Sequence, residues 1–462
     1  MTDSRLDSLV HEFRTGAIDR RTLLMRASAL GLGAAAAASL GGGAAVFAQT
    51  PEASPATFKA GAESLTPEGL GVAGITHSTD TSKGTIHVYS SWPMSGSSEQ
   101  TGGDSAEGCK YALEIFGGAA GGFKVEYTAM DDGIAANNGS WDATVESQNA
   151  TEVVNDPDAI AYIATYNSGA AEVSIPITNK ANMFQISPAN TAIRLTKDNP
   201  TNPEGYPGVL YPSGVRTYAR LVPADDIQGS ASANWAINEM GAKKAYVLHD
   251  NQTYGKGVAT VFNDTFIKLG GEVASFEAYD PKAPEYQALA TKVANSGADF
   301  IYIGAINDLN VPKLVQDLRD VVSADEVPIM GPDGIALQAF IDAAGEAAEG
   351  TWITFGGLPP TALEGTGKEW FDKMTERLGH SPDPYSIYSF ECMVTVLQAL
   401  DVVGEKDVKK VMETAMKTAD FRGLINTWSL GPTGDTTATT ISLNHVEDGK
   451  MVYQKVIEAP AS

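Results

Sequence analysis

Two short apolar runs end in turns that carry hydroxyl and amide side chains, and these turns are the residues best placed for binding chemistry. The run 159–165 is followed by Ser168, and the run 183–186 is followed by Asn190 and Thr191. Both runs are β-rich and short, which is typical of buried strands. The residues past the carboxyl ends of parallel strands form the ligand crevice of an α/β sheet. Ser168 would begin the next helix, whose N-terminal N–H groups suit a carboxylate or another small anion.

Each turn by itself has a purely structural explanation. A helix cap accounts for Ser168, and a simple turn accounts for Ser187-Pro188. Their occurrence at successive strand ends favours a ligand site.

No signature of an enzyme accompanies these turns. The sequence has no G-x-S-x-G elbow, no phosphate-binding glycine loop, no H-E-x-x-H motif and no closely spaced cysteine pair. The six histidines are scattered without metal-ligand spacing. We therefore expect a binding protein without catalytic residues, metal or cofactor.

The composition is that of a large acidic globular protein. With 462 residues, 43% hydrophobic and 19% charged, the chain is long enough for two or three structural units. Its 32 Lys and Arg stand against 57 Asp and Glu, which gives a net charge of −25. Nucleic-acid binding depends on clustered positive charge, so we expect no nucleic-acid partner.

Residues 1–48 are typical of an export signal. Arg20 and Arg21 begin a twin-arginine pattern, and the Ala/Gly-rich stretch 27–48 carries no charge after Arg26. The stretch ends in Val-Phe-Ala, which fits the small-residue cleavage rule at its last position. We expect export by the twin-arginine route and a protein that works outside the cytoplasm. An uncleaved membrane anchor stays open, because the stretch is just long enough to span.

The segment 49–83 is rich in Pro, Ser, Thr, Gly and Ala without periodicity, which predicts a flexible linker. Cys109 and Cys392 are the only cysteines, and both fall in expected helices. An oxidising compartment permits a disulfide between them, but the sequence leaves their pairing open.

From Gly84 onward strands and helices alternate, and the pattern restarts after Pro223. The expected strands are 85–90, 124–130, 159–165, 183–186, 244–249, 272–278, 300–303 and 328–330. The expected helices are 103–116, 141–154, 228–240, 257–269, 285–295 and 311–321. Such alternation predicts parallel sheets with helices on both faces. We expect an α/β fold of two doubly wound lobes, with a ligand site between them.

Six motifs then follow one another in a characteristic order. They are PMSG (93–96), DD (131–132), NSGA (167–170), ISPANT (186–191), HDNQTYGKG (249–257) and MGPDG (330–334). In this order and spacing, the chain from about residue 84 to its end resembles the solute-binding proteins of ABC transporters, in the branch that binds branched-chain amino acids and related amides.

The resemblance implies the fold of type I periplasmic binding proteins, in which three crossing strands join two lobes around a ligand cleft. Lobe 1 would comprise 84–221 plus 357–429, and lobe 2 would comprise 222–356 plus 430–462. It also implies a monomer that delivers a small amino acid to the membrane permease of an ABC importer by cleft closure.

The resemblance further implies which residues bind the ligand. They are Trp92, Ser168, Ala189, Asn190, Thr191, Tyr254 and Asp333. The hydroxyls of Ser168 and Thr191, with backbone groups at Ala189 and Thr191, match the family's cradle for the carboxylate and ammonium groups. A buried ammonium needs a paired partner, and Asp333 matches the family's acidic residue.

Tyr254 matches a ring of lobe 2 that closes over the ligand, and Trp92 would wall the side-chain pocket. Each of these assignments has a structural alternative. Asp333 precedes a glycine and fits a turn, Tyr254 fits a core position, and Trp92 fits ordinary packing.

Two departures from the family pattern leave the ligand's identity open. The stretch 304–308 (GAIND) is one residue longer than usual and lacks the family's tyrosine, and Asn190 stands where a small residue is common. Urea, short amides and aromatic acids are alternative ligands on the same fold, and an enzyme is the less favoured class. Asp333 favours a ligand that bears an ammonium group.

Overall fold

The computed structural model describes residues 60–460 of the chain. The predicted export signal, 1–48, and the first part of the predicted linker, 49–59, lie outside the described residues. Two large sheets organise the rest of the chain.

The first sheet has six strands in the order β2-β3-β1-β4-β5-β6. Its strands are β1 (Thr85–Trp92), β2 (Ala119–Ala120), β3 (Phe123–Asp131), β4 (Ala159–Ala164), β5 (Phe184–Ser187) and β6 (Tyr218–Arg220). All neighbours are parallel except β2, which pairs with β3 antiparallel at the edge. Every residue of β4 is buried, as expected for a central strand covered on both faces.

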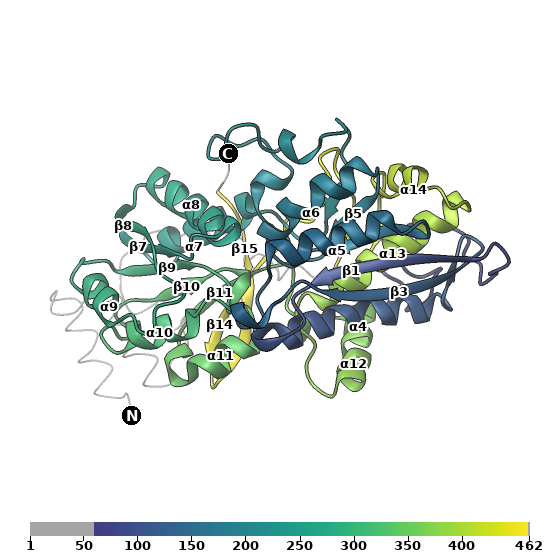
Figure 1. Cartoon of the computed structure of the whole chain (residues 1–462). Coiled ribbons are helices and arrows are strands. Elements are labelled where there is room, and N and C mark those ends of the chain that lie inside the picture. The colour runs from purple at the N-terminus through teal and green to yellow at the C-terminus, as the bar shows by residue number, and fades with distance from the viewer. Residues whose placement is uncertain (1–59, 461–462) are drawn as a thin grey trace, which may run out of the picture. The chain divides into compact units, whose positions relative to one another are not determined.

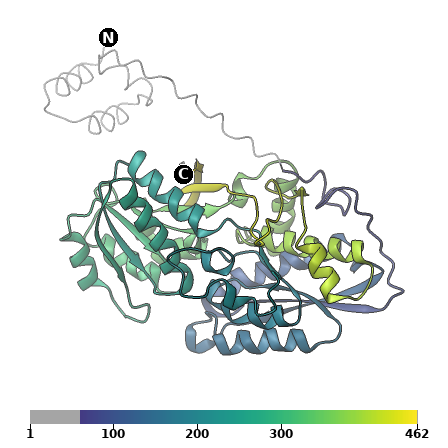
Figure 2. The same ribbon diagram turned by 90° about the horizontal axis from the view of Figure 1, so that it is seen from above.

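The helices of this first lobe come from distant parts of the sequence. They are α4 (Glu99–Ile115), α5 (Ala143–Asn155), α6 (Ser168–Lys180), α12 (Gly365–Leu378), α13 (Ser386–Val403) and α14 (Val408–Ala415). Helix α5 packs with α6, and α4 packs with α13. Figures 1 and 2 show the purple and blue N-terminal part lying together with the yellow-green segment of α13 and α14.

The second sheet has seven strands in the order β15-β14-β11-β10-β9-β7-β8. They are β7 (Lys244–His249), β8 (Glu272–Ala278), β9 (Phe300–Gly304), β10 (Ile329–Gly331), β11 (Trp352–Gly356), β14 (Ile441–Glu447) and β15 (Lys450–Ile457). The strands β7 to β11 are parallel, and the C-terminal hairpin β14–β15 adds antiparallel to β11. A small separate hairpin consists of β12 (Phe421–Arg422) and β13 (Thr427–Trp428).

Helices cover both faces of the second sheet, as Figure 1 shows. They are α7 (Asp225–Asn238), α8 (Thr253–Lys268), α9 (Gln287–Ala294), α10 (Val311–Arg319) and α11 (Gln338–Ala344). Helix α7 packs with α8, whereas α10 packs with α9 and α11. The predicted α/β fold of two doubly wound lobes is therefore confirmed, with antiparallel strands added at the sheet edges.

The chain crosses between the two sheets after β6, after β11 and before β14. The crossings are tied to one another: Gly357 N donates to Thr440 O at 2.8 Å, and the Arg220 guanidinium donates from Nε to Asp435 Oδ1 at 2.7 Å. The limits of the lobes given above stay predictions.

The segment 60–72, part of the predicted flexible linker, does not behave as a free tether. Gly71 and Arg422 exchange backbone hydrogen bonds, and Ala62 N donates to Gly423 O at 2.9 Å. Leu70 is buried among the side chains of lobe 1. The segment is polar on average but contains a few apolar side chains. Burying them contributes more free energy than the chain loses in conformational entropy.

Helix α13 is apolar and long enough to cross a membrane by length and composition, but 83% of its span is buried inside the fold. It carries Cys392, and α4 carries Cys109; both thiols are buried and free. Burial raises the pKa of both thiols, which is typical of cysteines that serve as small core residues.

Candidate functional site

The first lobe contributes the turn between β4 and α6. Ser168 is the first residue of α6, and Asn167 caps the helix. The Thr165 hydroxyl donates to Asn167 O at 2.8 Å, which fixes this turn. Ser168 Oγ accepts a long hydrogen bond of 3.3 Å from Ala192 N, so the hydroxyl also touches the turn after β5.

The turn after β5 is folded back by the last residue of the strand. Ser187 Oγ accepts from the N–H groups of Ala189 and Asn190 at 3.1 and 2.8 Å and donates to Thr165 O at 2.7 Å. The Ser187 hydroxyl therefore helps to hold together the two turns predicted to form the site. Serine suits this position because its oxygen donates one hydrogen bond and accepts two.

The second lobe contributes Tyr254, in the first turn of α8, and Asp333, two residues after β10. Tyr254 Oη donates to Asp333 Oδ1 at 2.6 Å and accepts from Gly334 N at 2.9 Å. Gly334 is required here because a Cβ atom would lie 2.6 Å from Ala305 O and 2.8 Å from the Tyr254 ring. The sequence motif Asp-Gly thus holds the carboxylate against the tyrosine.

Tyr385 belongs to the site and was missed by the sequence analysis. It lies at the N-terminus of α13 in lobe 1, and its hydroxyl donates to Asp333 Oδ2 at 2.5 Å, across to lobe 2. Its ring meets Tyr166 edge-to-face at 5.3 Å. The only signal in the sequence was a tyrosine in a Pro-Asp-Pro-Tyr turn before a long apolar helix, about 50 residues after the last assigned motif.

These side chains surround a cavity of about 20 Å³, which is room for one water molecule. It is lined by Tyr166, Asn167, Ser168, Ala189, Tyr254, Ile306, Asp333, Gly334 and Tyr385. Both lobes contribute, so any solute larger than water would enter only if the lobes moved apart.

Four predicted site residues line this cavity: Ser168, Ala189, Tyr254 and Asp333. The remaining three, Trp92, Asn190 and Thr191, do not.

Asn190 is fully buried and acts as a tie between turns, because its side chain donates to Tyr166 O and accepts from Tyr218 Oη, each at 2.9 Å. Thr191 is buried beside the Asp225 carboxylate, and Nε1 of Trp92 is buried and has no hydrogen-bond partner among residues 60–460.

The cavity is acidic. Asp333 is the only charged residue among those that line it. Burial raises the pKa of Asp333, while hydrogen bonds from Tyr254, Tyr385 and Gln228 act in the opposite direction. Burial and the neighbouring Asp333 together raise the pKa of both tyrosines, which therefore stay protonated and donate. A cation bound beside Asp333 would oppose the effect of burial, because a nearby positive charge favours the ionised carboxylate.

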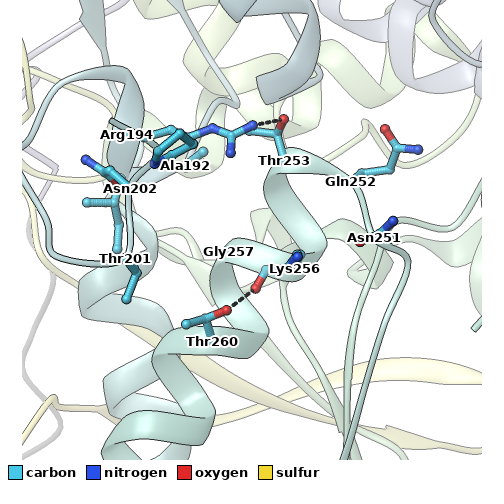
Figure 3. A pocket seen from close by; sticks show the side chains of 12 residues that line it. Ala192, Arg194, Thr201, Asn202, Asn251, Gln252, Thr253, Lys256, Gly257 and Thr260 are labelled. Carbon is cyan, nitrogen blue, oxygen red and sulfur yellow. Dashed lines mark hydrogen bonds between the residues drawn. The ribbon is translucent and has the colours of Figure 1, made fainter. Parts of the chain in front are cut away.

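A larger cavity of about 550 Å³ lies between the chain after β5 and the start of α8. Figure 3 shows its polar lining, in which Arg194 Nη2 donates to Thr253 Oγ1 at 2.5 Å across the two lobes. The lining also includes Asn202, Lys256 and Thr260, but none of the predicted ligand residues. We interpret this hollow as a solvent-filled opening at the rim of the boundary between the lobes.

Within residues 60–460, one group of side chains is close enough together to hold a metal ion: His87, Asp156 and Asp158. It lies in lobe 1, away from the cavity. His87 Nδ1 already contacts Asp156 Oδ2 at 2.6 Å, Tyr89 donates to the same oxygen, and Lys406 pairs with Asp158. These partners satisfy the group without a metal.

Comparison with known proteins agrees with this arrangement. Residues 85–450 match the family model described as "Periplasmic binding protein". A leucine-, isoleucine-, valine-, threonine- and alanine-binding protein of Pseudomonas aeruginosa is 25% identical over 71% of this chain and 81% of its own.

Two solved structures share the fold. A leucine binding protein from Thermotoga maritima has a TM-score of 0.70 at 23% identity, covering 80% of this chain and 98% of its own. A solute binding protein from R. palustris in complex with benzoate has a TM-score of 0.68 at 19% identity, covering 82% and 98%. Proteins of this kind bind small solutes outside the cytoplasm and pass them to ABC permeases. By the extent of the family match, this chain belongs to the periplasmic binding protein family.

Proposed function

We propose that this protein binds a small amino acid, branched-chain or similar, between its lobes and delivers it to the permease of an ABC importer. The observation that carries the proposal is Asp333, a buried carboxylate that faces the cavity without a cationic partner among residues 60–460. An α-ammonium group supplies that partner, in a charge-assisted hydrogen bond.

The remaining polar groups of the cavity suit the other end of an amino acid. Ser168 and the first N–H groups of α6 would bind the carboxylate, because a helix N-terminus favours negative charge. Ala189, with a backbone carbonyl, would complete the ammonium cradle, and Tyr254 with Tyr385 would close over it. In this proposal Asn190 shapes the turn, and Trp92 is part of the buried core.

Aromatic acids are a second candidate, because one structural neighbour is in complex with benzoate. Such a ligand carries a carboxylate and no ammonium, so it would bring a second negative charge to Asp333. Like charges at close range in a buried site are costly. Urea and short amides would leave Asp333 without a countercharge.

A thermal-shift screen tests the proposal. Leucine, isoleucine, acetamide, urea and benzoate are compared at equal concentrations, because a ligand that binds only the folded state raises its melting temperature. At a concentration of about 100 Kd the gain is about 2.7 kcal/mol, which shifts the melting temperature measurably. A shift with benzoate and none with any amino acid would refute the amino-acid proposal.

We further propose that the protein is exported by the twin-arginine route and acts as a monomer. The support for export is the sequence at Arg20 and Arg21 and the cleavage pattern that ends at Ala48. Mass spectrometry of the exported protein should find a chain that starts at Gln49. A chain that keeps residue 1 in the membrane fraction would show an anchor instead.

A further inference from the structure

The loop after β9 departs from the family pattern and lies against the site. Ile306 lines the cavity, and Asn307 N donates to Gly334 O at 3.0 Å, which holds the loop beside the turn of Asp333. The next residue, Asp308, accepts a hydrogen bond through Oδ2 from the Ser98 hydroxyl of lobe 1. The loop therefore places a second carboxylate where the lobes meet.

A third carboxylate approaches from lobe 1. Asp383 is 4% exposed and accepts from Thr101 Oγ1 at 3.0 Å and from Tyr385 N at 2.9 Å. Asp383 thus lies next to the cavity through Tyr385, as Asp308 does through Ile306, whereas Asp333 lines the cavity itself. After burial itself, the charges of Asp383, Asp308 and Asp333 are what raise the pKa of the Tyr166 hydroxyl.

None of these three carboxylates forms an ion pair with a lysine, arginine or histidine among residues 60–460. Their donors are hydroxyls, two amide side chains and backbone N–H groups. Burial raises the pKa of all three, and that of Asp383 to about 7. Buried carboxylates without a countercharge are costly, and a cation relieves that cost.

Two buried amide oxygens, one in each lobe, also lack a donor. Asn167 Oδ1 on the cavity wall and Asn307 Oδ1 beside Asp308 have no hydrogen-bond partner within the described part of the chain, and the residues are only 7% and 8% exposed. The site is therefore short of donors as well as of positive charge. An α-ammonium group has three donors, and a donor that binds Asp333 is not left for the amide oxygens or for the other two carboxylates.

We propose that the preferred ligand is a basic amino acid, whose α-ammonium binds Asp333 and whose side-chain ammonium or guanidinium lies toward Asp308 and Asp383. The inference rests on the proposed function and narrows its ligand class. The methylene stem would lie along Ile306 and the ring of Tyr166, as the stems of long cationic side chains do on apolar surfaces. The rings of Tyr166 and Tyr385 add favourable cation–π contacts.

Isothermal titration with lysine and norleucine tests the inference, because the two ligands differ only in the terminal ammonium group. We expect lysine to bind at least about tenfold more tightly, the effect of one or more hydrogen bonds to a charged group. The variant Asp308→Asn should lose most of this preference and change norleucine binding by less than about threefold. Asp264→Asn, at an exposed position of α8, is the matched control and should keep the preference.

Norleucine or leucine binding as tightly as lysine, or more tightly, would overturn the inference and leave the proposed function intact. Absence of binding for every amino acid would overturn both. A wild-type preference for lysine that survives in Asp308→Asn would remove the role given to Asp308. The wild-type comparison decides on ligand class even if the variant does not fold.

Discussion

Replacing Asp333 with asparagine separates charge from shape at the centre of the proposed site. The carboxylate is 3% exposed and receives hydrogen bonds of 2.6 and 2.5 Å from Tyr254 and Tyr385. Asparagine has nearly the same volume, and its amide can accept from one tyrosine and donate to the other. The variant therefore removes the negative charge and keeps the packing.

The expected loss follows from the burial of the pair. Removing one partner of a buried charge pair costs about 3–5 kcal/mol, which is roughly two to three and a half factors of ten in Kd. Folding should change little, within about 1 kcal/mol, because the buried carboxylate has no countercharge to lose in the unliganded protein. Binding and stability thus respond very differently to the same substitution.

Isothermal titration with the best ligand from the screen gives the Kd, and thermal melting gives the stability. Asp264→Asn, which removes an exposed charge on α8, should change neither quantity. If Asp333→Asn binds the ligand within about threefold of wild type while the control also binds normally, Asp333 does not pair with an ammonium, and a neutral ligand becomes the better explanation.

Three other substitutions and one export test extend this reasoning. Ser168→Ala removes one of several donors near the carboxylate and should weaken binding by about 1–3 kcal/mol, less than Asp333→Asn in the same titration; an equal or larger loss would contradict the assignment. Burial raises the pKa of Glu146 to about 8 from its ordinary 4.5. Between these two pH values the native protein holds a proton that the unfolded chain has released. The free energy of unfolding should therefore fall as pH rises through this range, by up to about 1.4 kcal/mol per pH unit. Denaturant unfolding at pH 5 and pH 8 should show that the free energy of unfolding depends less on pH in Glu146→Gln than in the wild type. The same pH dependence in both proteins would argue against the raised pKa of Glu146. Arg220→Met leaves Asp435 and the carbonyl of Ala192 without their buried partner and should lower the free energy of unfolding by about 3–5 kcal/mol, whereas a loss below about 1 kcal/mol would show that the pair is solvated. Replacing Arg20 and Arg21 with lysine should stop export as seen in cell fractions, and normal export would point to another route.

Much of the fold follows from local sequence patterns. The strands at 244–249 and 272–278 were predicted with their exact bounds. The alternation of strands with helices was enough to predict two doubly wound lobes. Alternation works because hydrophobic periodicity is a property of neighbouring residues and needs no tertiary information. The motifs around Ser168, Tyr254 and Asp333 could also be assigned to the candidate site from the sequence, because each one follows the end of a strand.

The tertiary structure decided what lies beside those motifs. Tyr385 reaches Asp333 only because the chain returns to lobe 1 and packs α13 against α4, a contact between residues far apart in sequence. Asn190 was predicted to bind the ligand, and its bonds to Tyr218 and to the backbone of Tyr166 could be known only from the tertiary structure. The segment 60–72 was predicted to be part of a flexible linker because composition reports average polarity, whereas the buried Ala62 and Leu70 and backbone hydrogen bonds to residues 422 and 423 fix it in place. Which side chains meet across the fold depends on the packing of residues far apart in the sequence. Local patterns in a single sequence do not specify those pairs.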